Sequence, residues 1–432
     1  MGSPPRPMPP LIRSPSPAAP QWVVLRRIPR VSRTDNDLPQ DTTAFLLALE
    51  APPGLSVVSQ LVIATDRGGP DRSAAFVRAA DSCGILLLSG SLADDKPSAS
   101  ASYFLFDAVS NTVRRLPDWP GNGGGIAGLS VAAGGGSHNH NFMVAELVPP
   151  FSATNGGSAA LHCFSPEPGV WVHKPLRFPD RIRLPWHSAH VLYYDGKLWW
   201  VDLSQGLLAC DPFAVKPELH FVPLPSSGRL AKGDWKQRRD AGKHRCLNVS
   251  GGKLRFVVIQ AHACVPKIKL WTLADPAAGE WTLDHEARLQ DIWDDQSYTN
   301  TGLSKKRPSL ALVHPGKPNV VYFFLQKHLF GVDLRTKAVT ESSPHEHEGD
   351  EAAASSSSVL AWELPPSVTI SSAGRQHVQE EITTSTFDRI ADSLYDAYTR
   401  VFADMEFDRL AKIALGYRDK KTEKEDNKFK VS

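Results

Sequence analysis

The stretch that decides the fold runs from residue 190 to residue 213 and reads HVLYYDGKLWWVDLSQGLLACDPF. Asp195 and Gly196 stand between two runs of β-branched and aromatic residues. An Asp-Gly dipeptide in that setting is the strongest short signal for a β-hairpin with a two-residue turn. The stretch therefore predicts two antiparallel strands and a further strand that ends near Asp211.

A related element recurs along the chain. It consists of an apolar or aromatic run, an acidic or serine turn, and a strand that ends near a large apolar residue. The turn residues of the five copies are Asp107, Ser165, Asp211, Asp275 and Asp333. Their spacings of 58, 46, 64 and 58 residues are close to the roughly 50 residues of a kelch-type blade.

These repeats predict an all-β protein. A four-stranded sheet cannot bury both faces alone, whereas several sheets stacked radially hide their apolar faces and leave only short edges. We therefore expect a β-propeller-like ring of about five to six blades. Residues 22–63 would supply the sixth blade or the strand that closes the ring, and a pair of β-sandwich domains is the alternative.

The two ends of the chain differ in composition from its middle. Residues 1–20 hold eight prolines and no acidic residue, which predicts a disordered arm. Beyond the propeller-like domain at 21–340, an acidic and serine-rich stretch at 341–358 predicts a solvated linker. Residues 359–416 predict a strand and helix segment, with helical apolar spacing from Phe387 to Leu415, and 417–432 form a charged tail.

Net charge and cysteine content exclude several classes of protein. Lys and Arg total 48 against 46 for Asp and Glu, a formal charge of +2, so no global field draws the chain to nucleic acid or to a membrane. Five cysteines without a C-x-x-C pair predict free thiols in a reducing compartment. No apolar run approaches the roughly 18 residues of a membrane helix. We expect a cytoplasmic or nuclear protein, with organelle import through the arginine-rich N-terminus as the alternative.

The motifs that could indicate catalysis or cofactor binding do not lie in the structural setting that these functions require. Gly123 to Gly128 matches G-x-G-x-x-G, but it follows a proline-rich turn instead of a strand, which favours a blade-connecting loop. His138 and His140 lie beside Ser137, and His345 and His347 flank Glu346; both groups are interpreted as solvated loop residues. The basic run Lys305-Lys306-Arg307 is interpreted as an exposed loop, with nuclear import as the alternative. The sequence thus predicts no catalytic residue, no cofactor and no metal.

Trp199 and Trp200 are the candidate binding residues. Neighbouring side chains in a strand face opposite sides, so both tryptophans are expected in the core between blades. If either were exposed, it would serve as an anchor for a protein partner, because Trp is enriched at interface hot spots.

Several segments resemble a plant family that is expanded in grasses and catalogued as domain of unknown function 1618. The segments are 22–31, 84–88, 190–213, 219–225, 271–284 and 311–333, with 199–202, 210–213 and 314–324 as the most specific. The resemblance covers about residues 20–340 and implies the β-propeller region that follows plant F-box motifs, a regulatory role, and a loose link to stress responses and reproductive development. It brings no catalytic residues. An F-box needs a three-helix module ahead of the propeller, which residues 1–21 cannot hold, so we do not expect a ubiquitin-ligase adaptor.

Three functions remain open at this point. The first is a non-catalytic scaffold that binds another protein. The second is an enzyme with a site on the ring axis, which would need several carboxylates or histidines to converge there. The third is a protein that binds nucleic acid through the basic N-terminal arm, which would show a steep dependence on salt.

Overall fold

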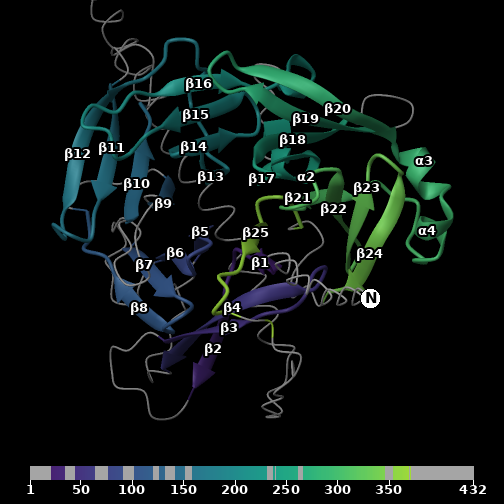
Figure 1. Ribbon diagram of the computed structural model, residues 1–432, viewed down its shortest axis with the longest axis horizontal. Helices are drawn as coiled ribbons and strands as arrows, with labels where there is room; N and C mark the ends of the chain where they lie inside the picture. Colours follow the sequence, from purple (N-terminus) through teal and green to yellow (C-terminus); the bar gives the residue numbers. More distant parts are fainter. Residues whose placement is uncertain are drawn as a thin grey trace, which may run out of the picture.

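The computed structural model describes residues 21–34, 44–63, 76–90, 102–119, 126–131, 142–150, 158–230, 237–238, 240–260, 266–345, 354–368 and 370. Six β-sheets in this part of the chain are arranged around a common centre (Figure 1). The predicted all-β propeller is confirmed, and it has six blades. The predicted N-terminal arm, the helix from Phe387 to Leu415 and the charged tail lie outside the described residues.

Five blades are antiparallel sheets of four consecutive strands. The first three are β5 to β8 (Phe76–Ala80, Ile85–Gly90, Ser102–Asp107, Thr112–Arg115), β9 to β12 (Ile126–Val131, Phe142–Val148, Ser158–Phe164, Trp171–Arg177) and β13 to β16 (His190–Tyr194, Lys197–Asp202, Gly206–Cys210, His220–Pro223). The next two are β17 to β20 (Arg245–Ser250, Lys253–Gln260, Lys267–Asp275, Glu280–Arg288) and β21 to β24 (Ser309–Val313, Val320–Leu325, His328–Asp333, Ala338–Pro344). In the described residues the helical elements are short: η2 (Ser226–Gly228), α2 (Ala241–His244), α3 (Leu289–Trp293) and α4 (Gln296–Thr299).

The sixth blade joins the two ends of the described chain. β25 (Val359–Glu363) pairs antiparallel with β1 (Trp22–Arg26) along five residues. β4 (Leu55–Ile63) pairs parallel with β1 and with β2 (Arg30–Thr34), and antiparallel with β3 (Ala44–Ala48). Residues 22–63 therefore supply most of this blade, and a strand that lies more than 300 residues after β1 in the sequence completes it.

The region predicted as a solvated linker is ordered at both ends. β24 extends to Pro344, and the side chain of His345 is buried edge-on against Phe324 at 5.5 Å between ring centroids. Ser356 is also buried, and its hydroxyl donates to the carbonyl of Arg245 at 2.7 Å. The composition of this region predicted that it is exposed to solvent. Composition alone does not show that a serine hydroxyl such as that of Ser356 has a main-chain hydrogen-bond partner. His347 lies outside the described residues.

The core lies between the blades. Middle strands such as β15 and β22 are buried at every position, whereas the outer strand β12 is mostly exposed. Trp199 packs in an apolar cluster with residues of β17 and β18, and Trp200 packs in a different cluster with residues of β10 and β11. Their exposed fractions are 2% and 0%. One strand thus contributes alternate side chains to two interfaces between blades, which excludes separate β-sandwiches.

The predicted hairpin is confirmed. Val191 pairs with Trp200 across β13 and β14, and the turn residues Asp195 and Gly196 have φ values of 50° and 71°. A two-residue turn with both φ angles positive matches the right-handed twist of the flanking strands.

Candidate interaction face

Connections between blades gather at one end of the ring. At this end, the chain passes from the outermost strand of one blade to the innermost strand of the next. Because consecutive strands of a blade are antiparallel, the turn between its two middle strands lies at the same end. Around β13 to β16, this face is made by residues 178–189, 203–205 and the described part of 224–244.

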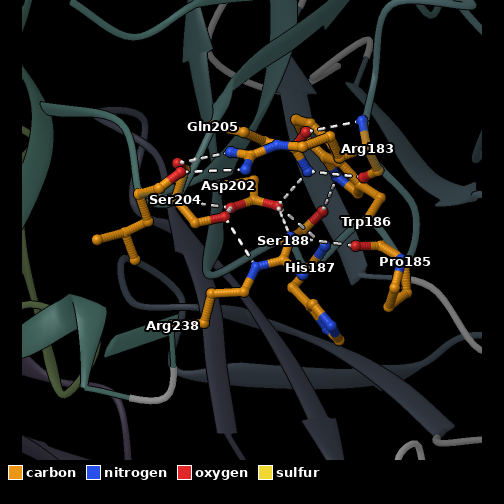
Figure 2. A network of polar contacts seen from close by, with 10 residues as sticks. Arg183, Pro185, Trp186, His187, Ser188, Asp202, Ser204, Gln205 and Arg238 are labelled. Atoms are coloured by element: carbon orange, nitrogen blue, oxygen red, sulfur yellow. Dashed lines mark hydrogen bonds and ion pairs between the residues drawn. The ribbon is translucent and has the colours of Figure 1, made fainter. Parts of the chain in front are cut away.

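Asp202, the last residue of β14, holds this face together (Figure 2). Its side chain is only 2% exposed. One carboxylate oxygen, Oδ1, accepts from the backbone N–H of Ser204 at 2.8 Å and from its hydroxyl at 2.5 Å. The other oxygen, Oδ2, accepts from Gln205 Nε2 at 2.8 Å, from the N–H of His187 at 3.3 Å and from Arg238 Nη2 at 3.3 Å.

A second layer of hydrogen bonds ties the same segments together. The Gln205 side-chain amide accepts from the N–H of Arg183 at 3.0 Å and donates to its carbonyl at 2.9 Å. Arg183 Nη1 donates to the carbonyl of Leu230 at 3.0 Å, and Arg238 Nη2 donates to the carbonyl of Pro185 at 3.2 Å. Three connecting segments are therefore fixed to one another through side chains.

The network is suited to support a surface and not to carry out proton transfer. A carboxylate offers about four lone-pair sites, and five donors already surround Asp202. A general base needs a free site within reach of the proton that it removes. The local sequence Asp-Leu-Ser-Gln gives the cause of the geometry, because an Asp side chain readily binds the backbone N–H two residues ahead.

An arginine and a histidine are buried in contact with the innermost strands. Arg27 is buried, and it donates to the carbonyls of Val359, Val77 and Arg78 at 3.2, 3.0 and 2.9 Å. It thereby bridges β25 and β5. Burial, and then the nearby charge of Arg78, lower the pKa of Arg27 to about 9, so the guanidinium stays charged at neutral pH.

His190 begins the innermost strand β13. Its Nε2 lies 2.9 Å from the carbonyl of Leu247 in the neighbouring blade, and its side chain is buried. Burial, and then the charge of Arg27, lower the pKa of His190 to about 3. Together, the six innermost strands contain a single histidine, His190, and a single carboxylate, Glu363.

The residues that the sequence singled out as candidate functional groups lie in separate parts of the structure. Trp199 and Trp200 are buried, so neither presents a ring to a partner in this structure. The glycine motif leads into strand β9 and not into a helix, while His138 and His140 lie outside the described residues. Lys305, Lys306 and Arg307 are exposed, and Lys305 forms an ion pair with Asp294 at 2.9 Å.

Cys83, Cys163, Cys210 and Cys246 are free thiols, and burial raises the pKa of Cys163 to about 11 and that of Cys210 to about 12. Within the described ranges, no group of three or more His, Cys, Asp or Glu side chains could hold a metal ion. None of the helices described is long and apolar enough to cross a membrane.

Comparison with known proteins supports the predicted family. Residues 200–322 match the model of a family described as protein of unknown function DUF1618, which confirms the resemblance. A protein of Arabidopsis thaliana named "Putative F-box/kelch-repeat protein" is 27% identical over 136 residues, 31% of this chain and 30% of the relative. The chain therefore matches about a third of that relative's length.

The solved structures that match this chain are distant from it in sequence and in structure. Saccharomyces cerevisiae Sqt1 has a TM-score of 0.33 at 10% identity, over 75% of this chain and 88% of that one. Apo AztD from Citrobacter koseri has a TM-score of 0.32 at 10% identity, over 77% and 85%. Porphyromonas gingivalis dipeptidyl peptidase 4 has a TM-score of 0.29 at 9% identity, over 72% and 43%.

Replacing Asp202 tests the support of the face. Asp202→Ala removes the ion-pair partner of Arg238 and the shared acceptor of several buried donors, so we expect the free energy of unfolding to fall by about 3–5 kcal/mol. Asp202→Asn keeps the shape and some acceptors, so a smaller loss of about 1–3 kcal/mol is expected. Chemical denaturation measures both. The control Asp180→Ala removes an exposed carboxylate and should change stability by less than about 0.5 kcal/mol; an equally small effect of Asp202→Ala would contradict the assignment.

Buried histidines predict acid sensitivity. Burial lowers the pKa of His190 to about 3 and that of His314 to about 4, below the value of about 6.5 for an unfolded chain. Between these values the unfolded state binds more protons, so stability falls as the pH drops from about 6.5 to 4, by up to about 1.4 kcal/mol per pH unit for each group. Unfolding measured against pH should show a shallower slope for His190→Gln than for the wild type. An unchanged slope would refute the prediction, and His220→Gln, at an exposed histidine, is the matched control.

Proposed function

We propose that this chain is a non-catalytic protein-interaction scaffold, and that it presents the face organised by Asp202 to a partner protein. The observation that carries the proposal is a pre-formed surface. Three connecting segments are locked by side-chain hydrogen bonds, and the carboxylate that locks them is fully engaged.

Pre-organisation is what a binding surface gains from such a network. Association is opposed by the ordering of loops and side chains at an interface. Segments already fixed by Asp202, Gln205 and Arg183 lose little freedom when a partner binds. The propeller and the F-box/kelch-repeat relative support the same proposal, since both point to a binding module.

The setting of this scaffold is proposed from the family resemblance and from the thiols. The resemblance supports a plant regulatory role, in stress responses or reproductive development. Free thiols at Cys163, Cys210 and Cys246 suit a reducing compartment, so we place the scaffold in the cytoplasm or nucleus. An enzyme with an axial site is the second candidate, and the composition of the innermost strands disfavours it.

Affinity purification from native plant tissue tests the proposal. The wild-type chain should retain a defined partner protein, and Ser226→Trp should lose it, because Ser226 is exposed on the face and a bulky ring would block contact. The control Lys253→Trp adds the same ring at the opposite end, where the turn after β17 is exposed. Failure of the wild type to retain any partner, or equal retention by both variants, would contradict the proposal.

A further inference from the structure

Arg27 is a buried cation whose hydrogen bonds all go to main-chain carbonyls. It follows β1, and it is only 4% exposed. Its Nε donates to the carbonyl of Val359, and its Nη1 donates to those of Val77 and Arg78. A guanidinium carries five N–H groups. The two on Nη2 therefore have no acceptor in the part of the chain that the structure describes.

The groups around Arg27 come from opposite sides of the ring. Val359 begins β25 and Val77 lies in β5, the innermost strands of two adjacent blades. His190 in β13 and Cys246 in β17 belong to the two blades on the far side, and both are near enough to interact electrostatically with Arg27. The innermost strands of four blades thus surround the guanidinium.

No described carboxylate offsets this charge. Burial and the charge of Arg78 both lower the pKa of Arg27, and within the described chain only the Cys246 thiol acts in the opposite direction. Burial raises the pKa of Cys246 itself, so this thiol is neutral at physiological pH. Glu363 lies at the other end of β25 from Val359. Buried charges in proteins are ordinarily paired with an opposite charge, and Arg27 therefore has an unmet capacity to bind an anion.

His190 does not supply the negative charge either. Its Nε2 lies 2.9 Å from the carbonyl of Leu247, so Nε2 carries the hydrogen and Nδ1 of the neutral ring is left as an acceptor. Nδ1 is buried, and it has no hydrogen-bond partner among the described residues. An anion close to Arg27 would favour a proton on this atom, because opposite charges stabilise each other. Each of the two side chains thus has hydrogen-bonding capacity that a bound anion would use.

From this arrangement we infer that Nη2 of Arg27 binds a small inorganic oxyanion, such as phosphate, between the innermost strands. A hydrogen bond between charged groups is about twice as strong as one between neutral groups. Three carbonyls already hold the guanidinium, so binding costs little rotamer freedom. Because Arg27 is buried, a free ion is favoured over the phosphate group of a larger molecule. The bound ion would link strands from opposite sides of the ring, and this site does not depend on the proposed partner.

Equilibrium dialysis of the purified full chain against radiolabelled phosphate tests this site. We expect one phosphate per chain and a thermal unfolding midpoint that rises with phosphate concentration, because the ion binds the folded state only. Arg27→Met keeps a long apolar side chain and removes the donors, so it should weaken binding at least tenfold. The matched control Arg181→Met removes an exposed arginine and should leave binding unchanged.

Arg27→Lys covers the case in which Arg27→Met does not fold. A lysine ammonium has three N–H groups, too few to serve three carbonyls and an oxyanion together, so binding should again fall at least tenfold although the charge is kept. Thermal unfolding without phosphate verifies that each variant is folded. Glucose 6-phosphate is the probe for a larger phosphate ester, and it should bind at least tenfold more weakly than inorganic phosphate.

Three results would overturn the inference. The first is a wild-type chain that takes up no phosphate at millimolar concentration. The second is uptake that Arg27→Met and Arg27→Lys leave unchanged, or that Arg181→Met also loses, since either would place the ion on the exposed surface. The third is binding of glucose 6-phosphate as tightly as phosphate, which would assign the site to a larger ligand. Partner capture in the Ser226→Trp experiment does not involve Arg27, so the proposed function stands or fails separately.

Discussion

Pairing of β25 with β1 is the constraint on which the rest of the structure depends. Five residues near the start of the described chain form an antiparallel ladder with five near its end, so both ends share one blade and the ring is closed. Trp362 fixes this contact further, because its ring is buried and its Nε1 donates to the carbonyl of Asp81 in the adjacent blade at 2.8 Å. Arg27, the residue after β1, adds hydrogen bonds to both β25 and β5.

Closure determines where the binding face lies. Once the blades form a ring, the connections between them lie at one end, and Asp202 can link segments that belong to different connections. The same closure explains the ordered serines before β25. The chain must return from β24 at the outside to β25 at the centre, and Ser356 makes hydrogen bonds to Gly242 and Arg245 on the way.

The blades could be predicted from the sequence because their signals are local. Asp195-Gly196 and the recurring turn residues mark hairpins, and apolar runs such as Val320–Leu325 mark strands buried on both faces. The partner of β25 could not be predicted, since no local pattern encodes pairing with β1. Asp202 was missed for a similar reason. Its sequence suggests a turn, but the donors from His187 and Arg238 come from other connections.

Native-state hydrogen exchange measured by mass spectrometry tests ring closure most directly. Peptides covering β1 and β25 should exchange as slowly as those covering β14 and β18, because opening the ladder would require the ring to unfold as a whole. If β25 exchanges rapidly through local opening while β14 and β18 remain protected, the terminal pairing does not hold the ring, and the account of its closure is contradicted.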